Sequence, residues 1–174
     1  MSPAHPAMIE LGTIAAALVE LGPERASAAA LARAAGVAKP TLYARFGSRE
    51  GLVEACVQHE AEHLLERIQT DDDPGSALAA YAAESPGWAL VLLGRHPVAV
   101  ATRGRIAARI AGQRGGAAGL TPLVAARAFL AAAPAVVALE SAADRERSLR
   151  ALAQALIPSR PAGPVAGARP SSSR

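Results

Sequence analysis

The chain has 174 residues and a mass of 17.6 kDa, and its hydrophobic residues (51%) are mostly alanine with few aromatic ones (3%), which favours an all-α protein over a β-sheet. The net charge of +3 comes from Arg160, Arg169 and Arg174, because residues 1–58 and residues 59–157 each balance to zero. Overall charge is therefore no evidence for a nucleic-acid partner.

Other features of the sequence exclude further classes of protein. A lone cysteine, Cys56, rules out an intramolecular disulfide framework. The longest apolar run, residues 128–139, is shorter than the roughly 20 residues that span a bilayer. Met1 to Pro6 lack the basic start and apolar run of a secretory signal. We expect a cytoplasmic protein with no membrane contact and no cofactor.

Helical signals follow one another along the chain. Apolar residues at three- and four-residue spacing predict a first helix, which Gly22-Pro23 ends. Ser27 and Ser48 are the expected N-caps of the second and fourth helices. The predicted helices cover about residues 7–21, 28–34, 40–46, 49–70, 76–84, 86–94, 97–112, 122–140 and 142–157.

The turn before the third predicted helix is the most informative segment. Gly36 allows a positive φ at a sharp corner, and Val37 gives that corner an apolar side chain. Pro40 suits the first turn of a new helix, which makes Lys39 the expected N-cap. Two helices joined so closely predict a helix-turn-helix, and DNA is the first partner to consider.

A helical wheel gives the third helix two faces. Leu42 and Phe46, four residues apart, are expected to pack on Leu31 and the first helix. The opposite face and its flanks carry Pro40, Thr41, Tyr43, Ala44 and Arg45. Free N–H groups at a helix N-terminus suit a phosphate or a groove edge, so this face is the predicted DNA contact.

Residues 8–57 resemble the DNA-binding domain of the TetR family of bacterial regulators. The resemblance is carried by Glu20-Leu21-Gly22, Ala32-Arg33-Ala34-Ala35-Gly36-Val37, Thr41-Leu42-Tyr43 with Phe46, and Ser48-Arg49-Glu50 with Leu52. It implies a three-helix DNA-binding domain over residues 7–57, with its helix-turn-helix at 27–46. A helical ligand-binding and dimerisation domain would follow at 58–157. Residues 1–6 and the Pro/Ser/Arg-rich tail 158–174 are expected to be disordered.

The resemblance also implies roles for side chains. Thr41 and Tyr43 would hold backbone phosphates, Lys39 would contact a phosphate or a base edge, and Arg49 would clamp another phosphate. The candidate DNA-binding residues are Ser27, Lys39, Pro40, Thr41, Tyr43, Ala44, Arg45 and Arg49.

Two positions depart from the family pattern. Ala38 stands where the family commonly has serine, which weakens the cap of the third helix or shifts its start by one residue. Ala44 stands where larger side chains often reach into the groove, and its methyl group can contact only something like a thymine methyl. Base reading would therefore fall to Lys39, Thr41 and Arg45.

The fourth predicted helix holds a competing motif. His59-Glu60-Ala61-Glu62-His63 satisfies the H-E-x-x-H pattern of zinc hydrolases, but Glu62 is charged and no third ligand is obvious. Cys56, His59 and His63 share one predicted face, which could instead bind zinc or copper in a metal-responsive regulator. The alternative, which we favour, is that Cys56 packs as a small hydrophobe and no metal binds.

The family resemblance places a ligand pocket among residues 52–140. The candidate pocket residues are His63, Tyr81, Trp88, Leu92 and Phe129, although residues of this kind are more often simply part of the core. A mostly apolar lining predicts a hydrophobic or aromatic effector.

The last two predicted helices are expected to join a second copy of the chain. The first is apolar almost all round, although Pro134 would kink or interrupt it. The second has a leucine stripe of Leu149, Leu152 and Leu156, suited to a helix bundle.

The predicted function is a homodimeric transcriptional repressor, not an enzyme. Two recognition helices about 34 Å apart would bind double-stranded operator DNA of palindromic sequence, and a small molecule would release it. Besides the hydrolase, one alternative remains: an interaction protein that kept the fold and lost DNA binding. A mobility shift with the DNA upstream of the protein's own coding region distinguishes the repressor from the interaction protein.

Overall fold

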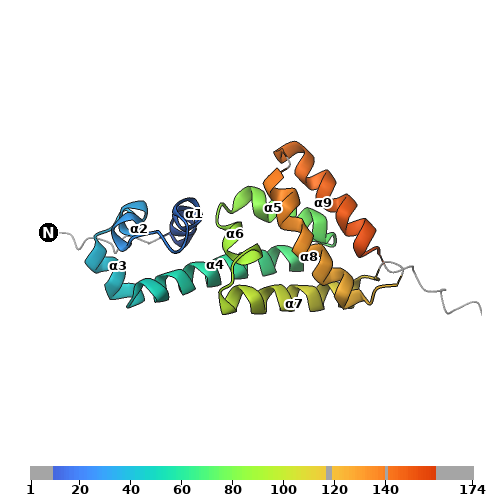
Figure 1. Ribbon diagram of the computed structural model, residues 1–174, viewed down its shortest axis with the longest axis horizontal. Helices are drawn as coiled ribbons and strands as arrows, with labels where there is room; N and C mark the ends of the chain where they lie inside the picture. Colours follow the sequence, from blue (N-terminus) through green and yellow to red (C-terminus); the bar gives the residue numbers. More distant parts are fainter. Residues whose placement is uncertain (1–9, 117–118, 140, 160–174) are drawn as a thin grey trace, which may run out of the picture.

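The computed structural model describes residues 10–116, 119–139 and 141–159, and these residues form an all-helical protein, as predicted (Figure 1). The helices are α1 (Leu11–Leu21), α2 (Ala28–Ala34), α3 (Lys39–Phe46), α4 (Arg49–Thr70), α5 (Pro74–Glu84), α6 (Trp88–Leu92), α7 (Pro97–Gln113), α8 (Pro122–Leu139) and α9 (Ala142–Leu156). No helix in this described part of the chain combines the length and apolarity needed to cross a lipid bilayer.

Helices α1, α2 and α3 and the first half of α4 form a small unit at one end of the molecule (Figure 1). Helices α1, α2 and α3 are each too short to be stable alone, and they bury apolar faces against one another and against α4. The N-terminal cluster that results includes the fully buried Ile14, Leu18, Leu31, Leu42, Leu52 and Cys56. The expected packing of Leu42 near Leu31 and the first helix is therefore confirmed.

The long helix α4 connects this unit to the C-terminal helices. Its last turns enter a larger C-terminal cluster with residues of α5, α7, α8 and α9. Its buried face runs through Leu52, Cys56, Glu60 and Leu64 in steps of four residues, whereas His59 is exposed. Cys56, His59 and His63, which were predicted to share one face, therefore differ in burial, because α1 and α5 cover the face that carries Glu60.

The corner between α6 and α7 reaches back to the N-terminal unit. Leu90 of α6 and Ala99 of α7 are buried in the same N-terminal cluster as Ile14 and Leu18. The N-terminal cluster therefore includes residues that lie beyond the predicted domain boundary at residue 57. The N-terminal unit contacts the C-terminal helices at two places, along α4 and at this corner.

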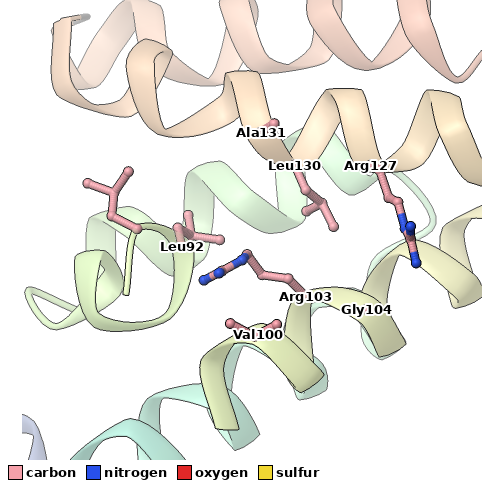
Figure 2. Close-up of a pocket in the computed structure, with 8 residues that line it drawn as sticks. Leu92, Val100, Arg103, Gly104, Arg127, Leu130 and Ala131 are labelled. Carbon is pink, nitrogen blue, oxygen red and sulfur yellow. The ribbon is translucent and has the colours of Figure 1, made fainter. Parts of the chain in front are cut away.

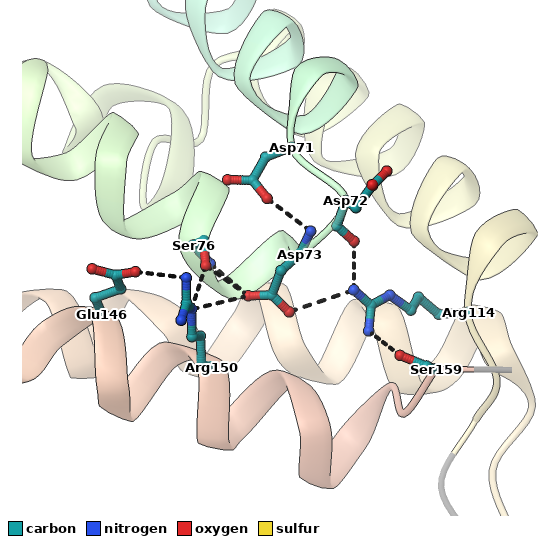
Figure 3. Close-up of polar contacts among 8 residues, drawn as sticks. All are labelled: Asp71, Asp72, Asp73, Ser76, Arg114, Glu146, Arg150 and Ser159. Atoms are coloured by element: carbon teal, nitrogen blue, oxygen red, sulfur yellow. Dashed lines mark hydrogen bonds and ion pairs between the residues drawn. The ribbon is translucent and has the colours of Figure 1, made fainter. Parts of the chain in front are cut away.

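A polar network holds the loop between α4 and α5 against distant parts of the chain (Figure 3). Asp73 caps α5 by accepting a hydrogen bond from the Ser76 N–H at 2.8 Å. Arg114, after α7, pairs with Asp73 at 3.4 Å and donates to the Ser159 hydroxyl at 2.9 Å. Arg150 of α9 donates to the Ser76 hydroxyl at 2.5 Å. Ser159 belongs to the predicted disordered tail, so that prediction is wrong for its first residues, and residues 160–174 lie outside the described part.

Two boundaries near the N-terminus differ from the prediction. Helix α1 begins at Leu11, and residues 7–9 of the predicted helix lie outside the described residues. Helix α3 begins at Lys39 with Ala38 as its N-cap, so Lys39 is the first helical residue and not the cap. Pro40 remains acceptable one position further in, because the first N–H groups of a helix have no intrahelical partner.

The last two helices also differ in detail from the prediction. Pro134 lies inside α8, and the helix continues past it to Leu139 without interruption. Leu149 of α9 is fully buried in the C-terminal cluster, and Leu152 and Leu156 pack against the same cluster. The leucine stripe of α9 therefore serves the core of its own chain, because α5 lies against that face.

Candidate functional site

Helix α2 ends in a tight turn that sets the direction of α3. The Val37 N–H donates to the Ala32 carbonyl at 3.0 Å and the Gly36 N–H donates to the Arg33 carbonyl at 3.1 Å. This pair of bonds is a Schellman motif, which requires a left-handed residue at its corner. Gly36 has a φ of 64° and meets that requirement without strain. The turn is thus specified locally, and α3 starts at Lys39.

Helix α3 has one buried face and one open face. Leu42 is 2% exposed, and Phe46 is partly buried against the same N-terminal cluster. The exposed residues are Lys39, Pro40, Thr41, Ala44 and Arg45. The two faces predicted from the helical wheel are therefore both present.

Two cations on the open face lie over aromatic rings. Lys39 Nζ is 5.6 Å from the centroid of the half-buried Tyr43 ring, and Arg45 Cζ is 5.6 Å from that of Phe46. Such contacts are worth about 0.5–1 kcal/mol at exposed sites. Among the described residues neither cation has a carboxylate partner. Their N–H donors are therefore available to an incoming anion such as a phosphate.

Ser27 and Arg49, by contrast, are engaged within the protein. The Ser27 hydroxyl accepts from the Ala30 N–H at 3.2 Å and caps α2. Arg49 Nε donates to the Ala26 carbonyl at 3.1 Å, and Nη2 donates to the Pro23 carbonyl. The guanidinium of Arg49 thus ties the start of α4 to the loop between α1 and α2, which differs from its predicted role as a phosphate clamp.

This arrangement of α1, α2, α3 and the start of α4 is also found by comparison with known families. Residues 11–56 match the model of the bacterial regulatory proteins of the tetR family. Residues 11–56 therefore form a DNA-binding domain of the TetR family. The helix-turn-helix of this TetR regulator is a DNA-binding module for the regulation of transcription.

The TetR regulator also resembles a solved structure over most of its length. A crystal structure of the TetR family transcriptional regulator PfmR from Thermus thermophilus matches with a TM-score of 0.65. The match covers 84% of this chain and 96% of that chain, at 20% sequence identity. At this identity the likeness shows a shared fold and nothing more. Comparison with curated proteins gave no match.

A cavity of about 500 Å³ lies among α6, α7 and α8 of the TetR regulator (Figure 2). Its volume falls within the range of small-molecule sites in proteins. The lining residues are Leu92, Leu93, Val100, Arg103, Gly104, Arg127, Leu130 and Ala131. The walls are therefore apolar except for two guanidinium groups.

Arg103 reaches from α7 to the end of α6 (Figure 2). Its Nη1 donates to the carbonyls of Val91 and Gly94, at 2.9 Å for the latter. No side chain caps the N-terminus of α6, so this five-residue helix depends on such outside contacts. Burial lowers the pKa of the Arg103 guanidinium, but arginine keeps its proton in proteins. Arg103 is a permanent cation that binds α6 and lines the cavity.

Of the predicted pocket residues, only Leu92 lines this cavity. Tyr81 and Phe129 are fully buried in the C-terminal cluster, and Trp88 packs against it. His63 is half-buried, with its ring edge-on to that of Tyr81 at 5.4 Å between centroids. The aromatic residues are buried because a core rich in alanine needs its few large side chains to fill space.

Glu60 is buried where α4, α5 and α6 meet. Its carboxylate is 1% exposed and accepts hydrogen bonds from the Tyr81 hydroxyl, at 3.0 Å, and from the Ser85 hydroxyl. Burial, and then the Glu60 charge, raise the pKa of Tyr81 well above its usual value. Gly87 lies so close to the carboxylate that a side chain there would collide with it. His59 is exposed, whereas Glu60 is buried and already accepts hydrogen bonds from two hydroxyls, so this arrangement lends the hydrolase interpretation no support.

The proposed metal face is not assembled either. Cys56 is fully buried, and burial, followed by the Glu60 charge, raises the pKa of its thiol to about 12. His59 is exposed and His63 is half-buried against Tyr81. In the described ranges no group of three or more His, Cys, Asp or Glu side chains is placed to hold a metal ion. The structure thus places Cys56 as a small core residue.

Sequence reasoning missed the two cavity arginines. Arg127 is the only charged residue in α8, and a lone charge in so apolar a helix is a usable signal. Arg103 gives a weaker signal, because α7 contains three arginines and only tertiary contacts distinguish this one.

Proposed function

We propose that this TetR regulator is a repressor that binds a palindromic operator as a homodimer and leaves it when a small molecule occupies the cavity among α6, α7 and α8. The observation that supports DNA binding most strongly is the open face of α3. Lys39, Thr41 and Arg45 are exposed there on a helix that Leu42 fixes to the protein core.

The proposed contacts divide into positioning and reading. Thr41 and Tyr43, at the start and flank of α3, would hold backbone phosphates, and Lys39 would reach a phosphate or a base edge. Arg45 would contribute to base reading, whereas the methyl group of Ala44 offers only apolar contact. Direct base readout would therefore be limited, and phosphate contacts would supply much of the affinity.

The outer face of α8 is the proposed dimer contact. Most of its exposed residues fall on one helical stripe of mainly small side chains, which allows close approach of a second helix: Val124, Arg127, Ala131, Ala135 and Ala138. Arg127 and Ala131 also line the cavity, so a second copy would lie beside the mouth of the cavity. The two α3 helices of such a dimer would enter successive major grooves about 34 Å apart.

Release would operate through the corner between α6 and α7. Leu93 lines the effector cavity and also a second crevice, of about 260 Å³, that includes Val19 of α1 and Pro23 of the next loop. Leu90, three residues earlier, is buried in the N-terminal cluster. A ligand that shifts the end of α6 would thus change how the DNA-binding unit rests on the rest of the chain. Ligand and operator would then favour different states of one equilibrium.

A mobility shift with the DNA upstream of the protein's own coding region, with and without candidate ligands, tests this proposal. Lys39→Ala is expected to weaken binding by about tenfold and to reduce the salt slope by about one. Tyr43→Phe is expected to weaken binding less. Arg109→Ala, an exposed arginine of α7, is the control that should change neither. Unchanged affinity and salt dependence for both Lys39→Ala and Tyr43→Phe would contradict the proposed interface.

Arg49→Ala provides a second comparison. Because Arg49 donates to two backbone carbonyls, its loss is expected to destabilise the N-terminal unit by about 1–3 kcal/mol and to leave the salt slope unchanged. A reduced salt slope with unchanged stability would instead restore Arg49 as a phosphate contact.

A further inference from the structure

The cavity among α6, α7 and α8 has an unbalanced charge. Its lining includes the guanidinium groups of Arg103 and Arg127 and no acidic side chain. The remaining surface is formed by leucine, valine, alanine and glycine. A neutral hydrophobic molecule would fill the apolar part but would leave two cations facing it without a counter-charge. The lining is complementary to an anion attached to an apolar body.

Arg127 has no structural partner among the described residues of its own chain. Its side chain is exposed and points from α8 into the cavity region (Figure 2). Within the residues that the structure describes, it forms neither an ion pair nor a side-chain hydrogen bond. A charge on an otherwise apolar helix is costly where the helix packs, so its position at the rim of this cavity favours a ligand contact.

Arg103 is bound on one side only. Its Nη1 donates to the Val91 and Gly94 carbonyls at the end of α6. A guanidinium has five N–H donors in a planar fork, so the Nε and Nη2 edge remains able to hold an oxyanion through two parallel bonds. One rigid group could then bind the ligand and the end of α6 together.

We propose that the effector is a small organic anion with an apolar body, held at its charged group by Arg103 and Arg127, with Arg103 transmitting its presence to the end of α6. This inference rests on the proposed ligand response and names the chemical class of the ligand. It adds a charged group to the hydrophobic or aromatic effector that the mostly apolar lining of the candidate pocket predicts. Because Leu90 of α6 lies in the N-terminal cluster, a change at this end of α6 reaches the DNA-binding unit.

Calorimetric titration of the full chain with matched ligands tests the class of effector. The probes are straight-chain carboxylates of increasing length, each with its uncharged methyl ester and its alkylammonium counterpart. At least one carboxylate is expected to bind about tenfold or more tightly than its ester and its cation. Trp88, the only tryptophan and the first residue of α6, gives a second signal through its fluorescence. Equal affinity for ester and carboxylate, or no binding by any carboxylate, would overturn the inference.

Two variants test the residues. Arg127→Gln is expected to lower the affinity for the carboxylate by about tenfold, and the control Arg109→Gln should leave this affinity unchanged. Arg103→Lys keeps the charge but loses the fork, so the carboxylate should still bind, more weakly, with a smaller change in Trp88 fluorescence and less release of DNA. Unchanged carboxylate affinity in Arg127→Gln, or full DNA release in Arg103→Lys, would contradict the assigned roles.

The mobility shift separates this inference from the proposed function. Release of operator DNA by a neutral compound, with no preference for carboxylates, would leave the ligand-responsive regulator standing and overturn the anionic effector. Preferential carboxylate binding that never releases DNA would support the anion site and contradict the proposed regulation.

Discussion

The helix-turn-helix and the proposed ligand cavity present their cations in opposite ways. On α3, Lys39 and Arg45 rest over aromatic rings and keep their donors for an incoming partner. In the cavity, Arg103 is already bonded to the carbonyls at the end of α6. The cations of α3 belong to a surface fixed by the core, whereas Arg103 joins the proposed ligand site to the end of α6. In the proposed mechanism this difference is needed, because α3 binds DNA and Arg103 transmits the presence of the ligand.

The two regions also differ in what holds them together. The N-terminal unit is specified by local devices: the Ser27 and Ser48 caps and the Schellman turn at Gly36. Helix α6 lacks a side-chain cap at its N-terminus and depends on burial and on Arg103. A region held by tertiary contacts responds to a ligand more readily than one held by its own turns.

The largest expected effects test whether the two regions are independent. Phe129→Ala in the C-terminal cluster should lower the free energy of unfolding by about 3–5 kcal/mol, and Leu42→Ala in the N-terminal cluster by about 2–5 kcal/mol. Because α4, Leu90 and Ala99 connect the clusters, each substitution should shift one shared transition. Urea unfolding followed by circular dichroism and Trp88 fluorescence checks this. Two separate transitions would show that the N-terminal and C-terminal clusters unfold independently of each other.

The two tyrosines offer a matched pair, one in each region. Tyr81→Phe removes a hydroxyl that donates to the buried Glu60 carboxylate, and should destabilise the protein by about 1–3 kcal/mol. Tyr43→Phe, on the surface of α3, should change stability by less than about 0.5 kcal/mol while weakening DNA binding. Thermal unfolding of both variants measures the contrast. Unchanged stability in Tyr81→Phe would show that the hydrogen bond from the Ser85 hydroxyl is sufficient for the buried Glu60 carboxylate.

Substitutions at the N-caps of α3 and α4 should change the stability by smaller amounts, with a gain at α3 and a loss at α4. Ser48→Ala removes the hydroxyl that accepts from the Gly51 N–H at 3.0 Å, and should cost about 1 kcal/mol. Ala38→Ser supplies a cap that α3 lacks, and should add about 0.5–1 kcal/mol. Denaturant unfolding measures both: the midpoint should fall for Ser48→Ala and rise for Ala38→Ser, while the dependence of the unfolding free energy on denaturant concentration stays unchanged. Loss of stability in Ala38→Ser would mean that the turn before α3 cannot accommodate the hydroxyl.

The smallest effect near neutral pH concerns Cys56, on α4 between the two regions. Because burial raises the pKa of its thiol from 9.0 to about 12, the folded state holds the proton more tightly than the unfolded state between these pH values. Its contribution to stability is therefore complete below pH 9 and declines as the pH rises toward 12. At about pH 8 a thiol reagent should react only after unfolding, and roughly 6 M urea provides the positive control. Rapid reaction of the native protein would show that α4 opens locally.

The sequence by itself determined the elements that depend on neighbouring residues. The second, third and fourth helices begin and end almost where their caps, glycine and proline predict, because these signals act within one turn of the chain. The buried and open faces of α3 also follow from helical periodicity alone. The start of α3 was missed by one residue, since Pro40 is acceptable at either of the first two helical positions.

Only the tertiary structure decided which face of a long helix is buried and which side chains meet. Periodicity could not choose between Glu60 and His59, because the choice depends on where α1 and α5 pack. The family resemblance placed Tyr81 and Phe129 in a pocket, whereas a core rich in alanine needs them to fill its interior. Arg49 and Arg103 acquired their partners from residues 23 to 26 positions and 9 to 12 positions away, respectively. Contacts of this kind arise from the packing of helices against one another, which local sequence does not encode.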